Sequence, residues 1–308
     1  PPARPPHPTI AALTAAATST DPAYSGLNPA DVSLINTDND TVNTLVVDTT
    51  SDTSGANDGT TTSIAALMAN KGTDGKISLR EAITAANATA NGSGGADRIH
   101  FAISGTGIHT ITLGSLLPDI VDALSIDATT DDSFTAAGSR PAIVLDGGNI
   151  VQDGLRLYPG SGGSTIRGLI IQSFTQDGID IGSSSGNTVA GNWIGLNSAG
   201  TGAAGNQQGV NIWNANNNII GGITAADRNV LSGNTGEGVY IGTDNATSTG
   251  NQIRGNYIGL NAAGTAAVGN LNLGVLTESG ASNTVGGSST AYGNVIAGTL
   301  NFEGIRLG

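Results

Sequence analysis

Residues 191–206 read GNWIGLNSAGTGAAGN, and residues 255–270 read GNYIGLNAAGTAAVGN. Twelve of the sixteen positions are identical, and the second stretch begins 64 residues after the first. An internal repeat at a fixed period is typical of a chain built from stacked copies of one structural unit. This repeat therefore decides the class of fold that the sequence predicts.

A shorter phrase of 31 to 33 residues recurs in the C-terminal half of the chain. Each phrase opens with one asparagine and carries a second asparagine just before an apolar pair. The first set is Asn187, Asn218, Asn251 and Asn283, and the second is Asn192, Asn229, Asn256 and Asn294. A glycine followed by alternating apolar residues, as in GVNI at residues 209–212, completes the phrase. Each phrase thus predicts three short strands separated by glycine and asparagine turns.

Three short strands in every phrase predict an all-β fold, a right-handed, three-faced parallel β-helix. One phrase cannot enclose a core, but stacking at ~4.8 Å per coil lets each strand pair with its counterpart in the next coil. Isoleucine, valine and leucine then fill the interior, while the asparagines stack so that each amide bonds the next. We expect irregular early coils over residues 96–163 and regular coils over residues 164–308.

The clearest helix signal precedes the coils. Ser78 and Glu81 match the S-x-x-E capping box. An apolar stripe follows at helical spacing, formed by Leu79, Ala82, Ile83 and Ala86. We expect a helix over residues 78–90, within a cap region of residues 46–95, to cover the open end of the solenoid. Residues 1–45 are rich in proline, alanine and threonine and are expected to form an arm.

The composition of the chain argues against several classes of binding partner. The 308-residue chain carries a net charge of −13 and only 11 lysines and arginines. No basic stripe is present, which argues against nucleic acid and anionic membranes as partners. No run of about 18 apolar residues occurs, so no membrane span is expected. The three histidines lack metal-ligand spacing, and no cofactor is expected other than the Ca²⁺ considered next.

One constellation of acidic residues could carry chemistry. The residue before the glycine of each third strand, and the residue two positions after that glycine, are predicted to form two exposed ladders on one face. Asp153, Asp177 and Asp180 would then cluster. They could pair for glycoside chemistry, in which the two carboxyl groups lie ~5–9 Å apart, or bind Ca²⁺ through oxygen ligands. We favour the simpler interpretation, a turn position that tolerates acidic residues, with Arg156 offsetting their charge.

The two copies of the long repeat differ at an aromatic position. Trp193 in the first copy corresponds to Tyr257 in the second. Two aromatic rings at equivalent places in stacked coils could form a platform on which a sugar stacks. The alternative, which we favour, is that both rings pack in the core or against a turn.

Several stretches resemble a known family. Residues 77–83 (ISLREAI) resemble the CSLREA motif that opens many large bacterial surface β-helix proteins. Residues 95–101 (GADRIHF) and 109–113 (HTITL) are similar to the strands that follow it in that family. The resemblance covers about residues 46–308 and implies a secreted or cell-surface protein with a helix that caps the solenoid. Ile77 stands at the cysteine position of the motif, so no cysteine-dependent role can operate here.

These observations favour an extracellular, non-enzymatic β-helix with a structural or adhesive role. No capping helix or polar coil follows the strand at residues 304–307, so either the sequence is a fragment of a longer chain or another copy covers this end. In the second case such a protein could assemble end to end into filaments, with the Pro-rich arm reaching over the next copy. Two alternatives stay open. One is a polysaccharide-active enzyme, either a lyase, a hydrolase or an epimerase, and the other is a non-catalytic carbohydrate-binding module.

Overall fold

The computed structural model describes residues 42–308 apart from 54, 56, 135–139, 245–247 and 279, and before them residues 11–12, 20 and 32–33. The chain divides into two units, Pro1–Thr41 with Gly92–Gly94, and Val42–Asn91 with Gly95–Gly308. In the first unit, β1 (Ala11–Ala12) pairs antiparallel with β2 (Val32–Ser33). The rest of the predicted arm before residue 42 lies outside the described residues. The second unit carries everything that follows.

Three parallel sheets form the second unit, and each contains one strand from every regular coil. The eight-stranded sheet consists, in spatial order, of β3 (Thr44–Val47), β4 (Asp97–Phe101), β6 (Leu124–Asp127), β9 (Thr165–Arg167), β12 (Thr188–Ala190), β15 (Ile219–Gly221), β18 (Gln252–Arg254) and β21 (Thr284–Val285). The seven-stranded sheet consists of β5 (His109–Thr112), β7 (Ile143–Asp146), β10 (Leu169–Gln172), β13 (Trp193–Ile194), β16 (Val230–Leu231), β19 (Tyr257–Ile258) and β22 (Val295–Ile296). The six-stranded sheet consists of β8 (Leu155–Leu157), β11 (Asp177–Gly182), β14 (Gln208–Trp213), β17 (Val239–Gly242), β20 (Val275–Thr277) and β23 (Ile305–Leu307).

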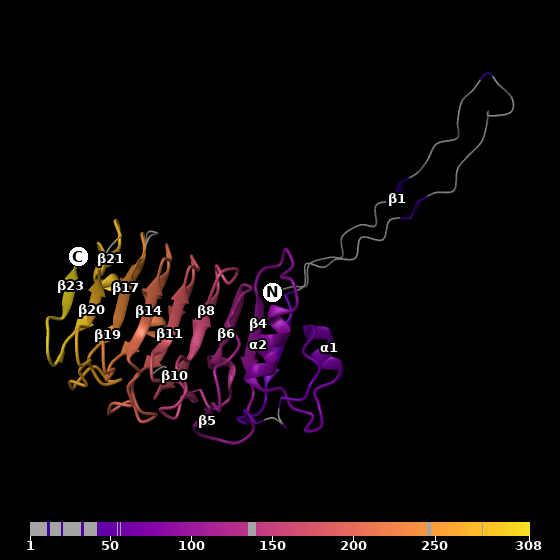
Figure 1. The fold of residues 1–308 in the computed structure, drawn as a ribbon, viewed down its shortest axis with the longest axis horizontal. Coiled ribbons are helices and arrows are strands. Elements are labelled where there is room, and N and C mark those ends of the chain that lie inside the picture. Colours follow the sequence, from indigo (N-terminus) through magenta and orange to yellow (C-terminus); the bar gives the residue numbers. More distant parts are fainter. Residues whose placement is uncertain are drawn as a thin grey trace. The chain divides into compact units, whose positions relative to one another are not determined.

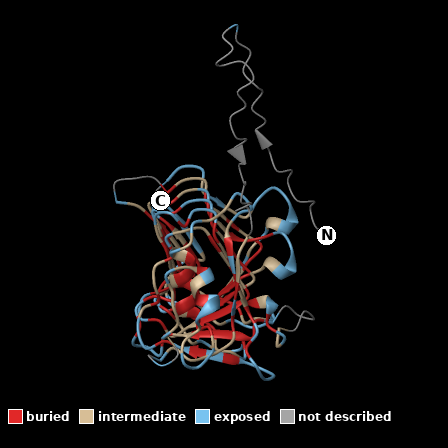
Figure 2. Ribbon diagram, turned by 90° about the vertical axis from the view of Figure 1, so that its right-hand side faces the viewer, coloured by how far each residue is buried: buried red, intermediate tan, exposed pale blue. Residues whose placement is uncertain are grey.

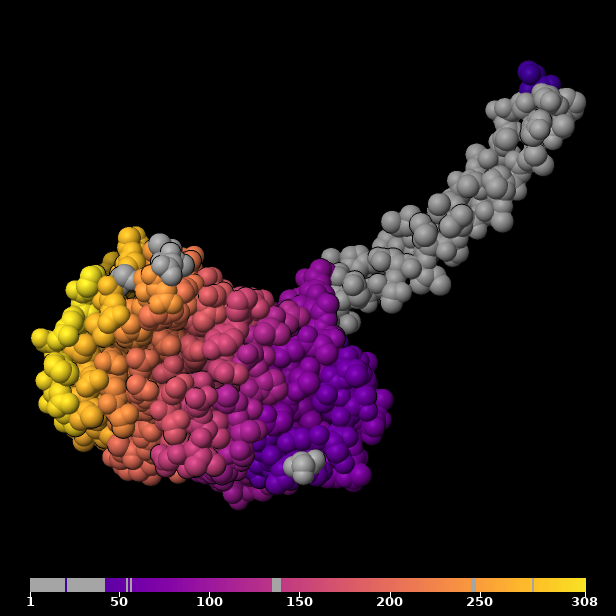
Figure 3. Space-filling view, in the orientation of Figure 1, coloured from indigo at the N-terminus to yellow at the C-terminus, as the bar shows by residue number. Residues whose placement is uncertain are grey.

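From β8 onward the chain visits the three sheets in a fixed cycle, which confirms the predicted three-faced parallel β-helix (Figure 1). The early coils are less irregular than the sequence suggested. β4 and β5 form two faces of the first coil, and Ile120 supplies the third through a parallel bridge to Leu157. Among the described residues, short 3-10 helices lie in the connections at η2 (Ala128–Thr130), η3 (Ala225–Asp227) and η4 (Thr290–Tyr292). Along the second unit the colours change in sequence order, because each coil lies beside its neighbours in the chain (Figure 3).

The interior is a continuous apolar core lined by the inward residues of all three sheets (Figure 2). Its buried polar residues include the asparagines at the bends. Asn187, Asn218 and Asn251 each donate from Nδ2 to Oδ1 of the asparagine one coil further on, at 3.0 to 3.1 Å. The second predicted set forms an equal ladder. A third ladder, not predicted, runs through Asn206, Asn234 and Asn270. Buried amides are therefore satisfied along each ladder.

A column of glycines marks the start of each strand in the six-stranded sheet. Its members are Gly154, Gly178, Gly209, Gly238 and Gly274. Gly304 precedes the sixth strand, and a Cβ atom at any of the first five glycines would lie 2.8 Å or less from the carbonyl oxygen of the glycine one coil further on. Adjacent coils approach so closely here that no side chain fits. Close backbone approach, and not an unusual backbone angle, therefore explains the glycine of the repeated phrase.

Two helices lie at the N-terminal end of the solenoid. α2 (Leu79–Asn87) has Ser78 as its N-cap with the predicted capping box, and it contacts β3 and β4. It ends three residues before the predicted residue 90. α1 (Ile64–Ala69), which was not predicted, begins at the N-cap Ser63 and contacts α2. The core-facing residues of α2 are buried, as expected of a cap over the first coil.

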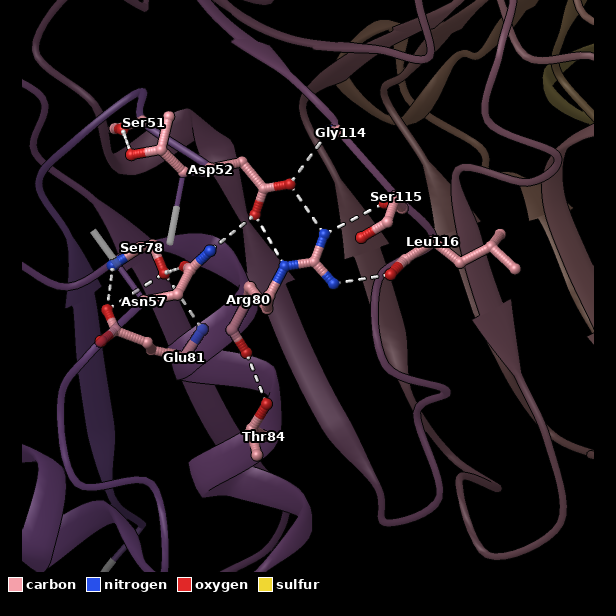
Figure 4. Close-up of polar contacts among 11 residues, drawn as sticks. Ser51, Asp52, Asn57, Ser78, Arg80, Glu81, Thr84, Gly114, Ser115 and Leu116 are labelled. Atoms are coloured by element: carbon pink, nitrogen blue, oxygen red, sulfur yellow. Dashed lines mark hydrogen bonds and ion pairs between the residues drawn. The ribbon is translucent and has the colours of Figure 1, made fainter. Parts of the chain in front are cut away.

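The residues of the SLREA sequence, at positions 78–82, have structural roles in the cap (Figure 4). Leu79 packs into the core, and buried Glu81 accepts from the backbone nitrogens of Ser78 (2.9 Å) and Gly59 (2.7 Å). Arg80 binds Asp52 through two hydrogen bonds of 2.7 Å and also donates to the carbonyl oxygens of Ser115 and Leu116. One side chain thus joins the cap to the loop that follows β5. The motif specifies the cap and its attachment.

Candidate functional site

The predicted ladder on the outer face of the six-stranded sheet is present. Parallel pairing brings residues of successive coils into one register on β8, β11, β14, β17, β20 and β23. The register runs Arg156, Asp180, Asn211, Tyr240, Leu276 and Arg306. Their neighbours along each strand, such as Ile179 and Ile181, point into the core. The outer face therefore presents a polar or aromatic residue at this position in every coil except that of Leu276.

The three predicted carboxylates are brought together. Nδ2 of Asn211 donates to Oδ2 of Asp177 at 3.1 Å and to Oδ1 of Asp180 at 3.0 Å, so one amide nitrogen bridges two acids. Oδ1 of Asp153 accepts from the backbone nitrogen of Asp177 at 3.0 Å. Asp177 is 9% exposed and Asp153 is 6% exposed. The acidic residues are thus part of a partly buried cluster with specific donors, and not a solvated turn.

Tyr158, which follows β8, completes the surroundings of Asp180. Its hydroxyl donates to Oδ2 of Asp180 at 2.8 Å. The guanidinium of Arg156 lies 5.5 Å from the centre of the Tyr158 ring and forms an ion pair with Asp119. Both hydrogen bonds that Asp180 accepts therefore come from neutral groups. Arg156 offsets part of the charge, as expected, but it is shared with another acid.

Burial and mutual repulsion raise the pKa values of the cluster. Burial, followed by the charges of Asp180 and Asp153, raises the pKa of Asp177 to about 8. Burial also raises the pKa of Asp180, partly opposed by the Tyr158 hydrogen bond, and burial raises the pKa of Asp153. Like charges held close together in a partly dry site cannot all be ionised at neutral pH. The cluster therefore holds at least one proton near neutral pH.

A pocket of about 350 Å³ opens beside Asp180. It is lined by Tyr158, Pro159, Asp180, Gly182, Ser183, Asn211 and Trp213. Trp213 stacks on Tyr240 with ring centres 6.0 Å apart and 14° between the planes, and its Nε1 donates to Asp244 at 3.2 Å. These contacts fix an aromatic wall next to a carboxylate and an amide.

Sequence reasoning missed Trp213, although a signal for it exists. Trp213 lies two residues after Asn211, so the period of two along a strand places both on the outer face. In register it pairs with Gly182 on one side and Gly242 on the other. A Cβ atom at Gly242 would overlap the rings of Trp213 and Tyr240, and one at Gly182 would overlap the ring of Tyr158. The glycines on each side leave room for the rings.

Trp193 and Tyr257 occupy the equivalent positions predicted from the repeat, with Val230 between them in register. Trp193 is 8% exposed and packs in a small apolar cluster with Val144, Ile170, Leu196 and Val230. The repeat loops fold over both rings, since a Cβ atom at Gly200 or Gly264 would overlap the ring of its own coil. These surroundings are those of the packing alternative, and a role in sugar stacking stays a prediction without support from them.

Across the described part of the chain, histidine, cysteine, aspartate and glutamate side chains form no group of three or more that could hold a metal ion. Asp177 and Asp180 share the Asn211 amide as a donor, while Asp153 accepts from the backbone nitrogen of Asp177, and calcium binding by these residues stays a prediction. None of the helices in the described residues is long and apolar enough to cross a membrane.

Comparisons with known proteins leave the family open. Neither a protein-family model nor a curated protein sequence matches the chain. The likeness to CSLREA-type surface proteins therefore stays a resemblance carried by the motifs quoted above. The function has to be argued from the geometry of the site itself.

Proposed function

We propose that this protein is a secreted or cell-surface β-helix scaffold that binds carbohydrate through the outer face of its six-stranded sheet. The observation that carries the proposal is the pocket in which the Trp213 wall, stacked on Tyr240, stands beside Asp180 and Asn211. An adhesive role follows if the ligand belongs to a surface or a matrix. Localisation outside the cell rests on the resemblance of residues 77–83 to the CSLREA motif.

The chemistry of the pocket suits a sugar. Aromatic rings present an apolar face on which the C–H side of a pyranose packs. Carboxylate and amide groups next to that face hydrogen-bond hydroxyls and fix the orientation of the ring. Asp180, Asn211 and Trp213 all lie on β-strands of a packed solenoid, so little conformational entropy is lost when a ligand binds.

The test is a glycan-binding screen by calorimetry or array. The wild-type protein is expected to bind at least one neutral or amino-sugar polymer, and Trp213→Ala should weaken that binding by about tenfold or more. Tyr292→Ala is the matched control, because Tyr292 is a partly exposed aromatic residue that contacts Arg254 in another coil connection. Binding that Trp213→Ala leaves unchanged would place the ligand elsewhere, and a protein that binds no glycan would refute the proposal.

Hydrolysis of the bound glycan is a second candidate, and one observation favours it. Asp177 and Asp180 are bridged by a single amide, and the pKa of Asp177 is raised to about 8. A protonated Asp177 could act as the general acid, with Asp180 as the partner carboxylate. New reducing ends that are lost in Asp177→Asn would support this function. Binding without new reducing ends, in every polymer that binds, would leave the protein as a binding module.

A further inference from the structure

The charged groups around the pocket are mainly negative. Asp180 is the only ionisable acid among the lining residues, and no lysine, arginine or histidine lines the pocket. Beyond it stand Asp153 and Asp177, then Glu237, which accepts from Gln208 and Asn272. The aromatic wall carries further carboxylates: Trp213 donates to Asp244, and Tyr240 donates to Glu278. Every donor in these four hydrogen bonds is neutral, so the field at the pocket is negative.

The nearest cation does not remove this field. Arg156 lies next to Asp180 in register, but its guanidinium pairs with Asp119 and lies over the ring of Tyr158. Asp180 accepts only from the hydroxyl of Tyr158 and the amide of Asn211. The burial and crowding that raise the pKa of Asp180 show that its negative charge is poorly compensated. A cation supplied from outside would interact favourably at this position.

A second observation points to a donor on the ligand. Oδ1 of Asn211 is buried and has no hydrogen-bond partner among the described residues. Its own Nδ2 already donates to Asp177 and Asp180, so rotating the amide would break those bonds. Two lining residues of the pocket are therefore incompletely paired: Asp180 has no cation partner of its own, and Asn211 keeps a buried acceptor without a donor. A group that brings both positive charge and several N–H donors matches the two deficits together.

We propose that the pocket selects glycans with free amino groups, binding a sugar ammonium at Asp180 while the pyranose ring packs on Trp213. This inference rests on the proposed carbohydrate binding and narrows its ligand class. Uronate polymers are disfavoured, since their carboxylates would meet Asp180 and its acidic neighbours. Neutral and N-acetylated sugars retain the aromatic contact but lose the charge. The wall of Trp213 adds attraction for the cation, because aromatic faces attract ammonium groups.

The test compares three oligosaccharides of equal length by calorimetry at about pH 6, where a glucosamine amine is cationic while part of the acidic cluster is ionised. They are a glucosamine oligomer, its N-acetylated form and an oligogalacturonate. The glucosamine oligomer should bind about tenfold more tightly than its N-acetylated form, and oligogalacturonate should bind weakest. The preference should shrink as salt is raised, because the ammonium–carboxylate attraction is screened.

The deciding variant is Asp180→Asn, which keeps the size of the side chain. It should abolish the preference for glucosamine, so that the ratio of the affinities for the glucosamine and the N-acetylated oligomer falls from about tenfold to within about twofold. Asp74→Asn is the matched control, since exposed Asp74 lies in the cap region and its loss changes the net charge equally. Equal affinity for the amine and the N-acetyl oligomer would overturn this inference and leave carbohydrate binding in place. If no oligomer or polymer binds at all, both the inference and the proposed function fail.

Discussion

Asn218 donates from Nδ2 to Oδ1 of Asn251, one coil further on, at 3.1 Å, and both side chains are wholly buried. Oδ1 of Asn218 also accepts from the backbone and side-chain nitrogens of Asn187. Each asparagine thus accepts hydrogen bonds from the asparagine in the coil before it and donates hydrogen bonds to the asparagine in the coil after it. The ladder lets a tight bend be buried without stranded polar groups.

Asn218→Ala is therefore expected to destabilise the protein strongly. The substitution removes the acceptor of the Asn187 backbone nitrogen and one of the two acceptors of Asn187 Nδ2, which also donates to Ser184. Oδ1 of Asn251 loses one of its two donors from residue 218 and keeps the backbone nitrogen. A buried polar group left without a partner costs about 1–3 kcal/mol. The midpoint of urea unfolding should fall clearly, as followed by far-ultraviolet circular dichroism. Asn301→Ala, at an exposed asparagine, is the control and should change the midpoint little. Equal midpoints for the two variants would contradict the role of the ladder.

The glycine column predicts that a glycine-to-alanine substitution destabilises the protein inside the column and not outside it. In Gly209→Ala the new methyl group would overlap the carbonyl oxygen of Gly238 and approach Nδ2 of Asn234. Overpacking of this kind costs about 1–3 kcal/mol or more, because the backbones of two coils must separate. Gly114→Ala, where nothing lies within 4 Å of the new atom, should be neutral. Thermal melts of both variants provide the comparison, and a wild-type melt for Gly209→Ala would argue against close coil contact.

The periodic half of the chain could be predicted because its physics is local and repeated. One strand phrase sets the period, and stacking converts that period into register, so Asp180 could be placed beside Asn211 before any coordinates. The 64-residue repeat also drew attention to Trp193, whose conspicuous position serves packing. Trp213 was missed because it occurs once, outside the repeated letters. An outward-facing residue that departs from the repeated pattern, such as Trp213, is a better candidate for a binding residue than one that conforms to the pattern, such as Trp193.

The N-terminal cap was less predictable, because it depends on contacts between distant residues. The capping box of Ser78 and Glu81 is local and was recognised. The pairing of Arg80 with Asp52 links residues 28 apart and has no local pattern. α1 is only six residues long, too short for a clear helical period. Proton sharing in the acidic cluster likewise depends on burial, which sequence spacing alone does not specify.

Arg80→Lys is expected to loosen the cap despite keeping the charge. A lysine cannot reproduce the two parallel hydrogen bonds to Asp52 or reach Ser115 and Leu116 at the same time. Hydrogen exchange should rise in residues 57–91, while the central coils stay protected. Lys76→Gln is the control, because Lys76 is more exposed and lies 4.0 Å from Asp48. Unchanged hydrogen exchange in Arg80→Lys would show that the hydrogen bonds of Arg80 are not needed to hold the cap in place.

A polypeptide of residues 1–308 is expected to self-associate through the coil that contains β23. Leu300, Phe302 and Leu307 are each more than half exposed there, and apolar groups gain free energy when a second copy covers them. Residues 1–308 should show concentration-dependent sedimentation, and Phe302→Asp with Leu307→Asp should reduce it. Ile150→Asp, at an equally exposed apolar residue among the early coils, is the control. A monomer at all concentrations would count against end-to-end assembly.

The acidic cluster predicts how stability changes with pH. The pKa of Asp177 is raised to about 8 in the folded protein, above its ordinary value of 3.8, so the folded state binds this proton more tightly than the unfolded state. Binding of this proton therefore adds to the free energy of unfolding. The added stability is complete below pH 3.8 and is lost as the pH rises toward about 8. Its slope is at most ~1.4 kcal/mol per pH unit, and Asp153 and Asp180 act in the same direction.

Asp177→Asn should therefore flatten the fall in unfolding free energy between pH 4 and about pH 8, as measured by urea titrations at several pH values. Asp227→Asn is the matched control with the opposite sign. Hydrogen bonds from Thr224 and Arg167 outweigh burial and lower the pKa of Asp227, so its contribution is lost only as the pH falls below 3.8. That variant should keep the wild-type slope above pH 4. A wild-type slope in Asp177→Asn would mean that the proton resides on another member of the cluster.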